Sequence, residues 1–244
     1  MKTRLDLILV ERGLAESREK AQRLILAGSV RLRGQTADKP GRLCDAESAI
    51  EVVRGARFVS RGGEKLEGAF QTFGLNVEGL ICLDVGASTG GFTDCLLQQG
   101  AAKVYAFDVG RGQLDWRLRN DPRVVVREGL NARFLEPQDV PDSVRFAAVD
   151  VSFISLTLIL PPVTKVVASG AQLVTLIKPQ FEAGREQVGT GGVVRDPAVR
   201  EEAIGKIKAF GMDRLGLEWI GVRESPLRGP AGNVEFLAVW RKTQ

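Results

Sequence analysis

The chain has 244 residues, 44% of them hydrophobic, which suits one large domain with a small one attached. It contains no histidine, and its three cysteines show no C-x-x-C spacing. This composition excludes a disulfide framework, a common zinc site and a histidine-based catalytic pair, so we expect no bound metal. Any general base must then be lysine, aspartate, glutamate or tyrosine.

Membrane-spanning segments are not expected. The longest uncharged apolar stretch, residues 151–164, contains two prolines and has about 14 residues, whereas a membrane helix needs about 20. The N-terminus turns at once into an amphipathic pattern with an acidic residue and has no apolar signal region. These features predict a cytoplasmic protein.

Positive charge is concentrated in the first quarter of the chain. Residues 1–63 hold 13 lysines and arginines against 8 acidic residues, whereas residues 64–244 hold 21 against 22. A basic segment in front of a neutral remainder is typical of a protein that binds a polyanion such as nucleic acid.

Two short helices, residues 5–12 and 17–28, are predicted first, and a glycine ends each of them. Short strands follow at residues 30–32 and 49–53. This layout and the pattern R-L-D-x-x-L-V-E-R-G-L-A-E-S-R-E-K-A resemble the S4 RNA-binding domain over residues 3–53. Its basic side chains suit contacts with RNA phosphates, and they are Arg4, Arg18, Lys20, Arg23, Arg31 and Arg33. The alternative is a solvated charged face on a packing module.

The predicted domain boundary comes next. We expect an S4-like RNA-binding domain over residues 1–54, a linker over residues 55–63 and a larger domain over residues 64–244. The linker reads G-A-R-F-V-S-R-G-G, and a helix that ends at Gly74 follows it. S4 domains accompany several kinds of enzyme, so the first segment indicates the partner and not the reaction.

Residues 81–94, I-C-L-D-V-G-A-S-T-G-G-F-T-D, are predicted to form a strand, a glycine-rich loop and the start of a helix. Glycine allows a positive φ and lets a ligand approach the backbone amides. The loop lacks the Lys-Ser/Thr of a P-loop and does not match G-x-G-x-x-G, so a nucleoside without a pyrophosphate fits it better. Asp108 ends the next strand, about 20 residues on, where doubly wound folds place the carboxylate that binds ribose hydroxyls.

The loop and Asp108 together indicate S-adenosylmethionine as the cofactor. The alternative is a tight turn followed by a helix cap. We expect Asn131 at the adenine edge. The candidate cofactor-binding residues are Asp84, Gly86, Ala87, Ser88, Gly90, Gly91, Phe92, Asp108, Val109 and Asn131.

The remaining elements alternate strands with helical segments and end in a hairpin. Strands are predicted at residues 124–126, 146–149, 172–177, 217–222 and 234–240, and a helix at residues 197–211. The alternation predicts a parallel sheet that binds ligands beyond the carboxyl ends of its strands. These ends carry Asp84, Asp108, Asp150 and Lys178. The predicted fold class is α/β, a Rossmann-like S-adenosylmethionine methyltransferase sheet with a closing antiparallel hairpin, preceded by a small α+β S4 domain.

Nearly the whole chain carries further motifs, among them V-S-R-G-G-x-K-L, L-D-V-G-A-S-T-G-G-F-T, D-V-S-F-I-S-L, L-I-K-P-Q-F-E and S-P-L-x-G-P-x-G-N-V-E-F. Together they resemble the TlyA family, often labelled hemolysin, which is similar to the FtsJ-like ribose methyltransferases with an S4 domain in front. The resemblance implies methyl transfer from S-adenosylmethionine to a cytidine 2′-hydroxyl of ribosomal RNA. Arg111 departs from the family, many members of which carry an aromatic residue there.

FtsJ-like enzymes use a Lys-Asp-Lys-Glu tetrad, and the matching residues here are Lys65, Asp150, Lys178 and Glu235. A ribose hydroxyl is a poor nucleophile, so a positioned base is a main demand of the reaction, worth about 10²–10⁴-fold in rate. The resemblance implies that Lys178 is the base and that Asp150 orients its ammonium group. Glu235 would hold Lys65 or the ribose. For each residue alone, the alternative is a surface ion pair.

Two other functions are considered beside the methyltransferase: a non-enzymatic RNA-binding or ribosome assembly factor, and a cytolysin as the family label suggests. The intact tetrad disfavours the first, and the lack of an apolar span disfavours the second. The expected partner is ribosomal RNA or a ribosomal subunit, and the sequence does not indicate an oligomeric state. The chain ends soon after Trp240 and resembles the shorter of two TlyA forms, so we expect it to modify the large subunit and leave the small subunit untouched.

Overall fold

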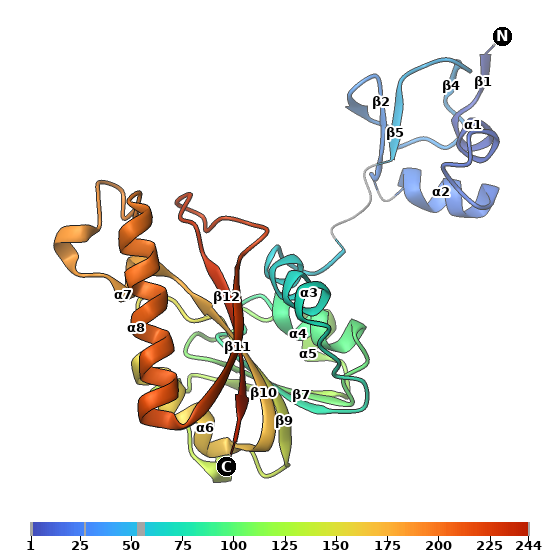
Figure 1. Ribbon diagram of the computed structural model, residues 1–244. Helices are drawn as coiled ribbons and strands as arrows, with labels where there is room; N and C mark the ends of the chain where they lie inside the picture. Colours follow the sequence, from blue (N-terminus) through green and yellow to red (C-terminus); the bar gives the residue numbers. More distant parts are fainter. Residues whose placement is uncertain (1, 27, 53–56, 244) are drawn as a thin grey trace. The chain divides into compact units, whose positions relative to one another are not determined.

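The computed structural model describes residues 2–26, 28–52 and 57–243. The chain forms two compact units, Met1–Arg57 and Phe58–Gln244 (Figure 1). Residues 55 and 56 of the predicted linker lie outside the described residues. Its later part belongs to the second unit, where Phe58 is buried and a helix begins at Gly62.

The first unit packs two helices against short strands. In chain order its elements are β1 (Lys2–Arg4), α1 (Leu5–Glu11), α2 (Arg18–Leu26), β2 (Val30–Leu32), β3 (Gln35–Thr36), β4 (Leu43–Asp45) and β5 (Ile50–Val52). Strands β3, β2 and β5 form one antiparallel sheet, and β1 pairs with β4. Leu5, Ile8 and Leu9 recur at helical spacing on α1 and are fully buried, as is Ile25 of α2.

The second unit is built on a seven-stranded sheet. Its strands are β6 (Ile81–Val85), β7 (Lys103–Asp108), β8 (Val124–Glu128), β9 (Val144–Val149), β10 (Val167–Ile177), β11 (Leu217–Glu224) and β12 (Phe236–Lys242), in the spatial order β11-β12-β10-β9-β6-β7-β8. Strands β10 to β8 of this order pair in parallel, and β12 joins antiparallel to both β10 and β11. The sheet is therefore the predicted parallel sheet with a closing antiparallel hairpin.

Helices cover both faces of this sheet (Figure 1). They are α3 (Gly62–Phe73), α4 (Gly91–Gln98), α5 (Trp116–Arg119), α6 (Leu156–Val166), α7 (Pro179–Glu182) and α8 (Pro197–Leu215), with three 3-10 turns at Ala132–Phe134, Pro137–Asp139 and Arg185–Gln187. Alternate strand residues face opposite layers. Cys82 packs in the core beneath α3 and α4, whereas Leu83 and Val85 pack in the core beneath α6 and α8.

The strand order brings four polar residues to one edge. Strands β10, β9, β6 and β7 are consecutive neighbours, and their carboxyl ends carry Lys178, Asp150, Asp84 and Asp108 in that order. The chain order reverses between β6 and β9, and the crevice at such a switch point is where doubly wound folds bind ligands. No helix within residues 2–26, 28–52 and 57–243 is long and apolar enough to cross a bilayer.

Helix α8 corrects one prediction. It continues past Gly211 to Leu215 and is capped by Gly216, whose φ of 63° suits glycine. Gly211 is a packing residue instead: a Cβ there would lie 2.5 Å from the Trp240 ring. That ring is fully buried, and its Nε1 donates to Thr175 Oγ1 at 3.0 Å.

Replacing Gly211 with alanine is expected to lower the free energy of unfolding of the second unit by about 1–3 kcal/mol, because Trp240 has no room to move. Gly205→Ala in the same helix is the matched control. A Cβ at position 205 would have nothing within 4 Å, so this variant should have a free energy of unfolding about 0.5–1 kcal/mol higher than wild type. Urea unfolding followed by tryptophan fluorescence measures both, since the three tryptophans lie in this unit. A Gly211→Ala protein as stable as the Gly205→Ala protein would contradict the packing role.

Candidate active site and RNA-binding surface

The glycine loop after β6 is shaped by protein contacts. Gly86 and Gly90 have φ of 88° and 98°, as the sequence predicts for a loop that needs glycine. A Cβ on Gly86 would collide with the carbonyl oxygen of Asp150, and one on Gly90 would collide with Leu118. Packing within the protein therefore already requires glycine at both positions.

Asp108 fixes the loop from the neighbouring strand. Its Oδ2 accepts the backbone N–H of Ser88 at 2.8 Å, and its Oδ1 accepts that of Gly110 at 2.6 Å. Each carboxylate oxygen keeps a further acceptor position. Asp108 also lines a cavity of about 500 Å³, together with Gly86, Ser88, Phe107, Val109, Gln113, Leu130, Asn131, Ala132 and the segment from Asp150 to Ile154. This volume is typical of a site for a small organic molecule.

A second cavity, of about 220 Å³, adjoins the first. Its walls include Arg61, Lys65, Ala87, Gly91, Phe92 and Pro230. Three residues line both cavities: Gly86, Ser88 and Asp150. Asp150 therefore stands at the boundary between the two.

The four residues of the predicted tetrad form two ion pairs, and of the four only Lys65 and Asp150 line a cavity. Lys178 Nζ lies 2.6 Å from Asp150 Oδ1 and donates to Ser152 Oγ at 2.9 Å. Lys65 Nζ donates to Glu235 Oε2 at 2.5 Å. Both lysines are more than nine-tenths buried. Buried charges are retained when paired, so each lysine is held in place by its carboxylate.

Asp84 lies behind the cavities and lines neither of them. It is fully buried at the end of β6, and its Oδ2 accepts the hydroxyl of Thr93 on α4 at 2.6 Å. Burial raises the pKa of Asp84 to about 7, although the Thr93 hydrogen bond opposes the shift. Its position indicates that it joins β6 to α4. Gly90, the other predicted cofactor residue outside both linings, packs against α5.

Several residues of the site were not predicted from the sequence. Phe153 is 90% exposed with a φ of 63°, lines the larger cavity, and has its ring 5.1 Å from that of Phe181. Lys178 Nζ lies 6.0 Å from the centre of the Phe181 ring. Phe153 lies in the motif D-V-S-F-I-S-L and Phe181 in L-I-K-P-Q-F-E, where the charged residues carry the stronger sequence signal. Arg111 is not part of either cavity lining and lies against Gly129.

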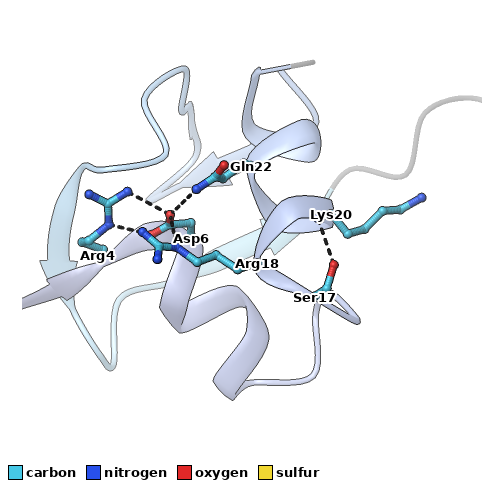
Figure 2. A network of polar contacts seen from close by, with 6 residues as sticks. All are labelled: Arg4, Asp6, Ser17, Arg18, Lys20 and Gln22. Carbon is cyan, nitrogen blue, oxygen red and sulfur yellow. Dashed lines mark hydrogen bonds and ion pairs between the residues drawn. The ribbon is translucent and has the colours of Figure 1, made fainter.

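In the first unit, two predicted RNA-binding arginines converge on a buried carboxylate (Figure 2). Arg4 donates to Asp6 through Nε at 3.0 Å and Nη2 at 2.9 Å, and Arg18 Nε donates at 3.1 Å. Gln22 Nε2 completes the network at 2.9 Å. The Arg4 hydrogen bond holds the pKa of Asp6 well below its usual range despite burial. Arg4 and Arg18 are therefore structural as well as basic.

The other predicted basic residues are exposed. Lys20 extends from α2 away from the Asp6 network (Figure 2). Arg33 donates to Asp45 and to Ser48, at 3.2 Å in each case. Arg23 and Arg31 lie on α2 and β2. Arg4, Arg18 and Arg33 thus bind acidic side chains of the same unit, and Arg18, like Arg33, is itself exposed.

Residues 58–242 match the FtsJ-like methyltransferase family, and residues 3–50 match the S4 domain. The 16S/23S rRNA (cytidine-2′-O)-methyltransferase TlyA of Mycobacterium tuberculosis (strain CDC 1551 / Oshkosh) is 49% identical over 245 residues, which cover 100% of this chain and 91% of that protein. The chain belongs to the TlyA family of FtsJ-like methyltransferases. The resemblance and the fold class predicted from the sequence are therefore confirmed.

Two other TlyA-like proteins extend the comparison. The 23S rRNA (cytidine-2′-O)-methyltransferase TlyA of Campylobacter jejuni subsp. jejuni serotype O:23/36 (strain 81-176) is 32% identical over 189 residues, covering 76% of this chain and 71% of that protein. A solved structure from Streptococcus thermophilus, described as a hemolysin, is 47% identical with a TM-score of 0.76 and covers 100% of this chain and 89% of that one. Proteins under both names thus share this architecture.

Replacing Asp108 with alanine is expected to weaken binding of S-adenosylhomocysteine about 10- to 150-fold, because charge-assisted hydrogen bonds are worth about 1.5–3 kcal/mol. Titration calorimetry measures the affinity. Asp213→Ala, an exposed change on α8, is the control and should bind as wild type does. Equal affinity of the Asp108→Ala protein and wild type would contradict the assignment of this carboxylate to the ribose.

Changing Lys20, Arg23 and Arg31 to alanine is expected to weaken RNA binding and flatten its salt dependence. Each lost phosphate contact removes about 0.7–0.9 from the slope of log affinity against log salt. Lys39→Ala, exposed in the same unit, is the control and should keep the slope. Arg4 and Arg18 are left unchanged, because removing them would leave Asp6 buried without a cation. An unaltered slope in the triple variant would show that these side chains do not contact RNA.

Proposed function

We propose that this TlyA protein transfers the methyl group of S-adenosylmethionine to the 2′-hydroxyl of a cytidine in large-subunit ribosomal RNA. The observation that carries the proposal is Asp150, which lines both adjoining cavities and lies 2.6 Å from Nζ of the buried Lys178. Transfer between two substrates requires two sites that meet at the reacting group. The names of the two TlyA relatives share 23S rRNA, which supports the large subunit as the substrate.

The larger cavity fits the cofactor. Asp108 would bind the ribose hydroxyls with its remaining acceptor positions, and Asn131 would meet the adenine edge. When bound, S-adenosylmethionine supplies an electrophilic methyl group on its sulfonium. Leu130, Val151 and Ile159 give the cavity an apolar wall against which the adenine would pack.

The smaller cavity would receive the target ribose. It lies beside the amino terminus of α3 and is lined by Arg61 and Lys65. Lys178 would take the 2′-hydroxyl proton at Nζ, and Asp150 would pair with the ammonium group that forms. Asp150 and Ser152 hold that Nζ in position, and Glu235 holds Lys65. Orientation of the hydroxyl by these groups would supply much of the rate enhancement.

Isolated large and small ribosomal subunits incubated with purified protein and labelled cofactor provide the test. We expect label on large-subunit RNA, recovered as 2′-O-methylcytidine after digestion to nucleosides. Substantial label on the small subunit would overturn the restriction to the large subunit and match the range named for the Mycobacterium tuberculosis protein. A wild-type protein that labels neither subunit, or labels a base, would contradict the proposal.

Lys178→Ala is expected to lower the methyl transfer rate by about 10²–10⁴-fold, because the reaction loses its base. Binding of S-adenosylhomocysteine should fall by no more than about tenfold, because Lys178 lines neither cavity and reaches the larger one only through Asp150 and Ser152. Lys165→Ala, an exposed lysine on α6, is the control and should transfer methyl groups normally. Transfer at the wild-type rate by Lys178→Ala protein would assign the base elsewhere.

A further inference from the structure

A buried carboxylate outside both cavities has no role in the proposed reaction. Glu182 ends α7, four residues after Lys178, and is 5% exposed. Its Oε2 accepts the hydroxyl of Ser155 at 2.6 Å, and its Oε1 accepts the backbone N–H of Leu156 at 2.7 Å. Lys206 of α8 lies 3.5 Å from Oε2 and donates to the Glu182 carbonyl at 2.7 Å. Burial raises the pKa of this carboxyl group, and its hydrogen bonds oppose the shift.

These contacts join the segments that follow β9 and β10. On one side, Lys178 binds Asp150 and Ser152. On the other side, Glu182 binds Ser155 and Leu156. Polar contacts thus connect the two segments at both ends, and the Phe153–Phe181 ring contact lies between these two sets of contacts.

The backbone conformation of Phe153 needs support from contacts nearby in the chain. Its φ of 63° lies in the left-handed region, which costs energy for a residue with a Cβ and persists where the surroundings fix it. Its side chain is 90% exposed, so burial of the ring does not hold the backbone there. The hydrogen bonds to Glu182 begin two residues later and carry a charge, which makes them strong.

The same segment is a wall of the larger cavity. Residues 150–154 all line it, whereas Glu182 lines neither cavity. We propose that Glu182 is a positioning residue, which holds this wall and the Lys178–Asp150 pair in the geometry that cofactor binding and methyl transfer require. This inference rests on the proposed function for its catalytic part, and its effect on the cofactor cavity can be measured separately.

Glu182→Gln is the sharpest variant, because it keeps the shape of the side chain. The amide oxygen can still accept the Leu156 N–H, but the NH2 group cannot accept the Ser155 hydroxyl. We expect about tenfold weaker binding of S-adenosylhomocysteine and an about tenfold slower single-turnover rate at saturating cofactor, the size of one lost charge-assisted hydrogen bond. Glu201→Gln, exposed on α8, is the control and should match wild type in both.

Ser155→Ala tests the same contact from the other side and keeps the buried carboxylate. It should shift affinity and rate in the same direction, and the double variant should be no worse than the more affected single variant. Additive losses in the double variant would show that the two residues act independently and would overturn the inference.

Melting curves separate positioning from stability, with affinity and rate measured well below the melting temperature of each variant. Lower melting temperatures with wild-type affinity and rate would show a merely structural role and overturn the inference. If wild-type protein labels no RNA, the proposed function fails, and the catalytic part of the Glu182 inference fails with it. If wild type is active and both variants equal it, this inference alone fails.

Discussion

The second unit depends on one close approach, between the backbone of Gly86 and the carbonyl oxygen of Asp150. Strands β6 and β9 are parallel neighbours, so the loops after them leave the sheet side by side. Without a Cβ at Gly86 the two loops touch, and with one they would be forced apart. Both cavities share these two residues. The spacing of the two cavities is therefore fixed by backbone contact and not by flexible side chains.

Burial of Lys65 and Lys178 costs desolvation free energy. Removing a charged pair from water is rarely repaid by the attraction between its members. Lys65, Glu235 and Lys178 are nevertheless buried, and Asp150 is partly buried, on elements that already have apolar cores on both faces of the sheet. Such groups contribute little to stability. Their burial is consistent with chemistry that needs a lysine away from bulk water.

The sequence predicted the site where the signal was local. Short apolar runs defined the strands of the large sheet, and the polar residue at the end of each run marked the shared edge that carries Asp150 and Lys178. Long-range contacts were not accessible in this way. In the sequence Gly211 has the pattern of a helix end, and only the structure shows that it packs against Trp240. Glu182 likewise has the pattern of a surface acid, and only the structure shows that it accepts a hydrogen bond from Ser155. Arg4 was predicted to bind RNA, because the spacing of residues in the sequence does not show that its guanidinium donates hydrogen bonds to Asp6.

The hydrogen-bond network around Asp6 also determines how mobile and how strongly charged Arg4 and Arg18 are when a polyanion approaches the first unit. Arg4 and Arg18 have lost much of their rotational freedom before any ligand arrives, and a long side chain immobilised on binding otherwise costs about 0.5–1.5 kcal/mol. The same carboxylate cancels one of their two charges. The pair thus presents ordered N–H donors at reduced charge density. A surface of this kind favours a phosphate at a defined place over phosphates in general.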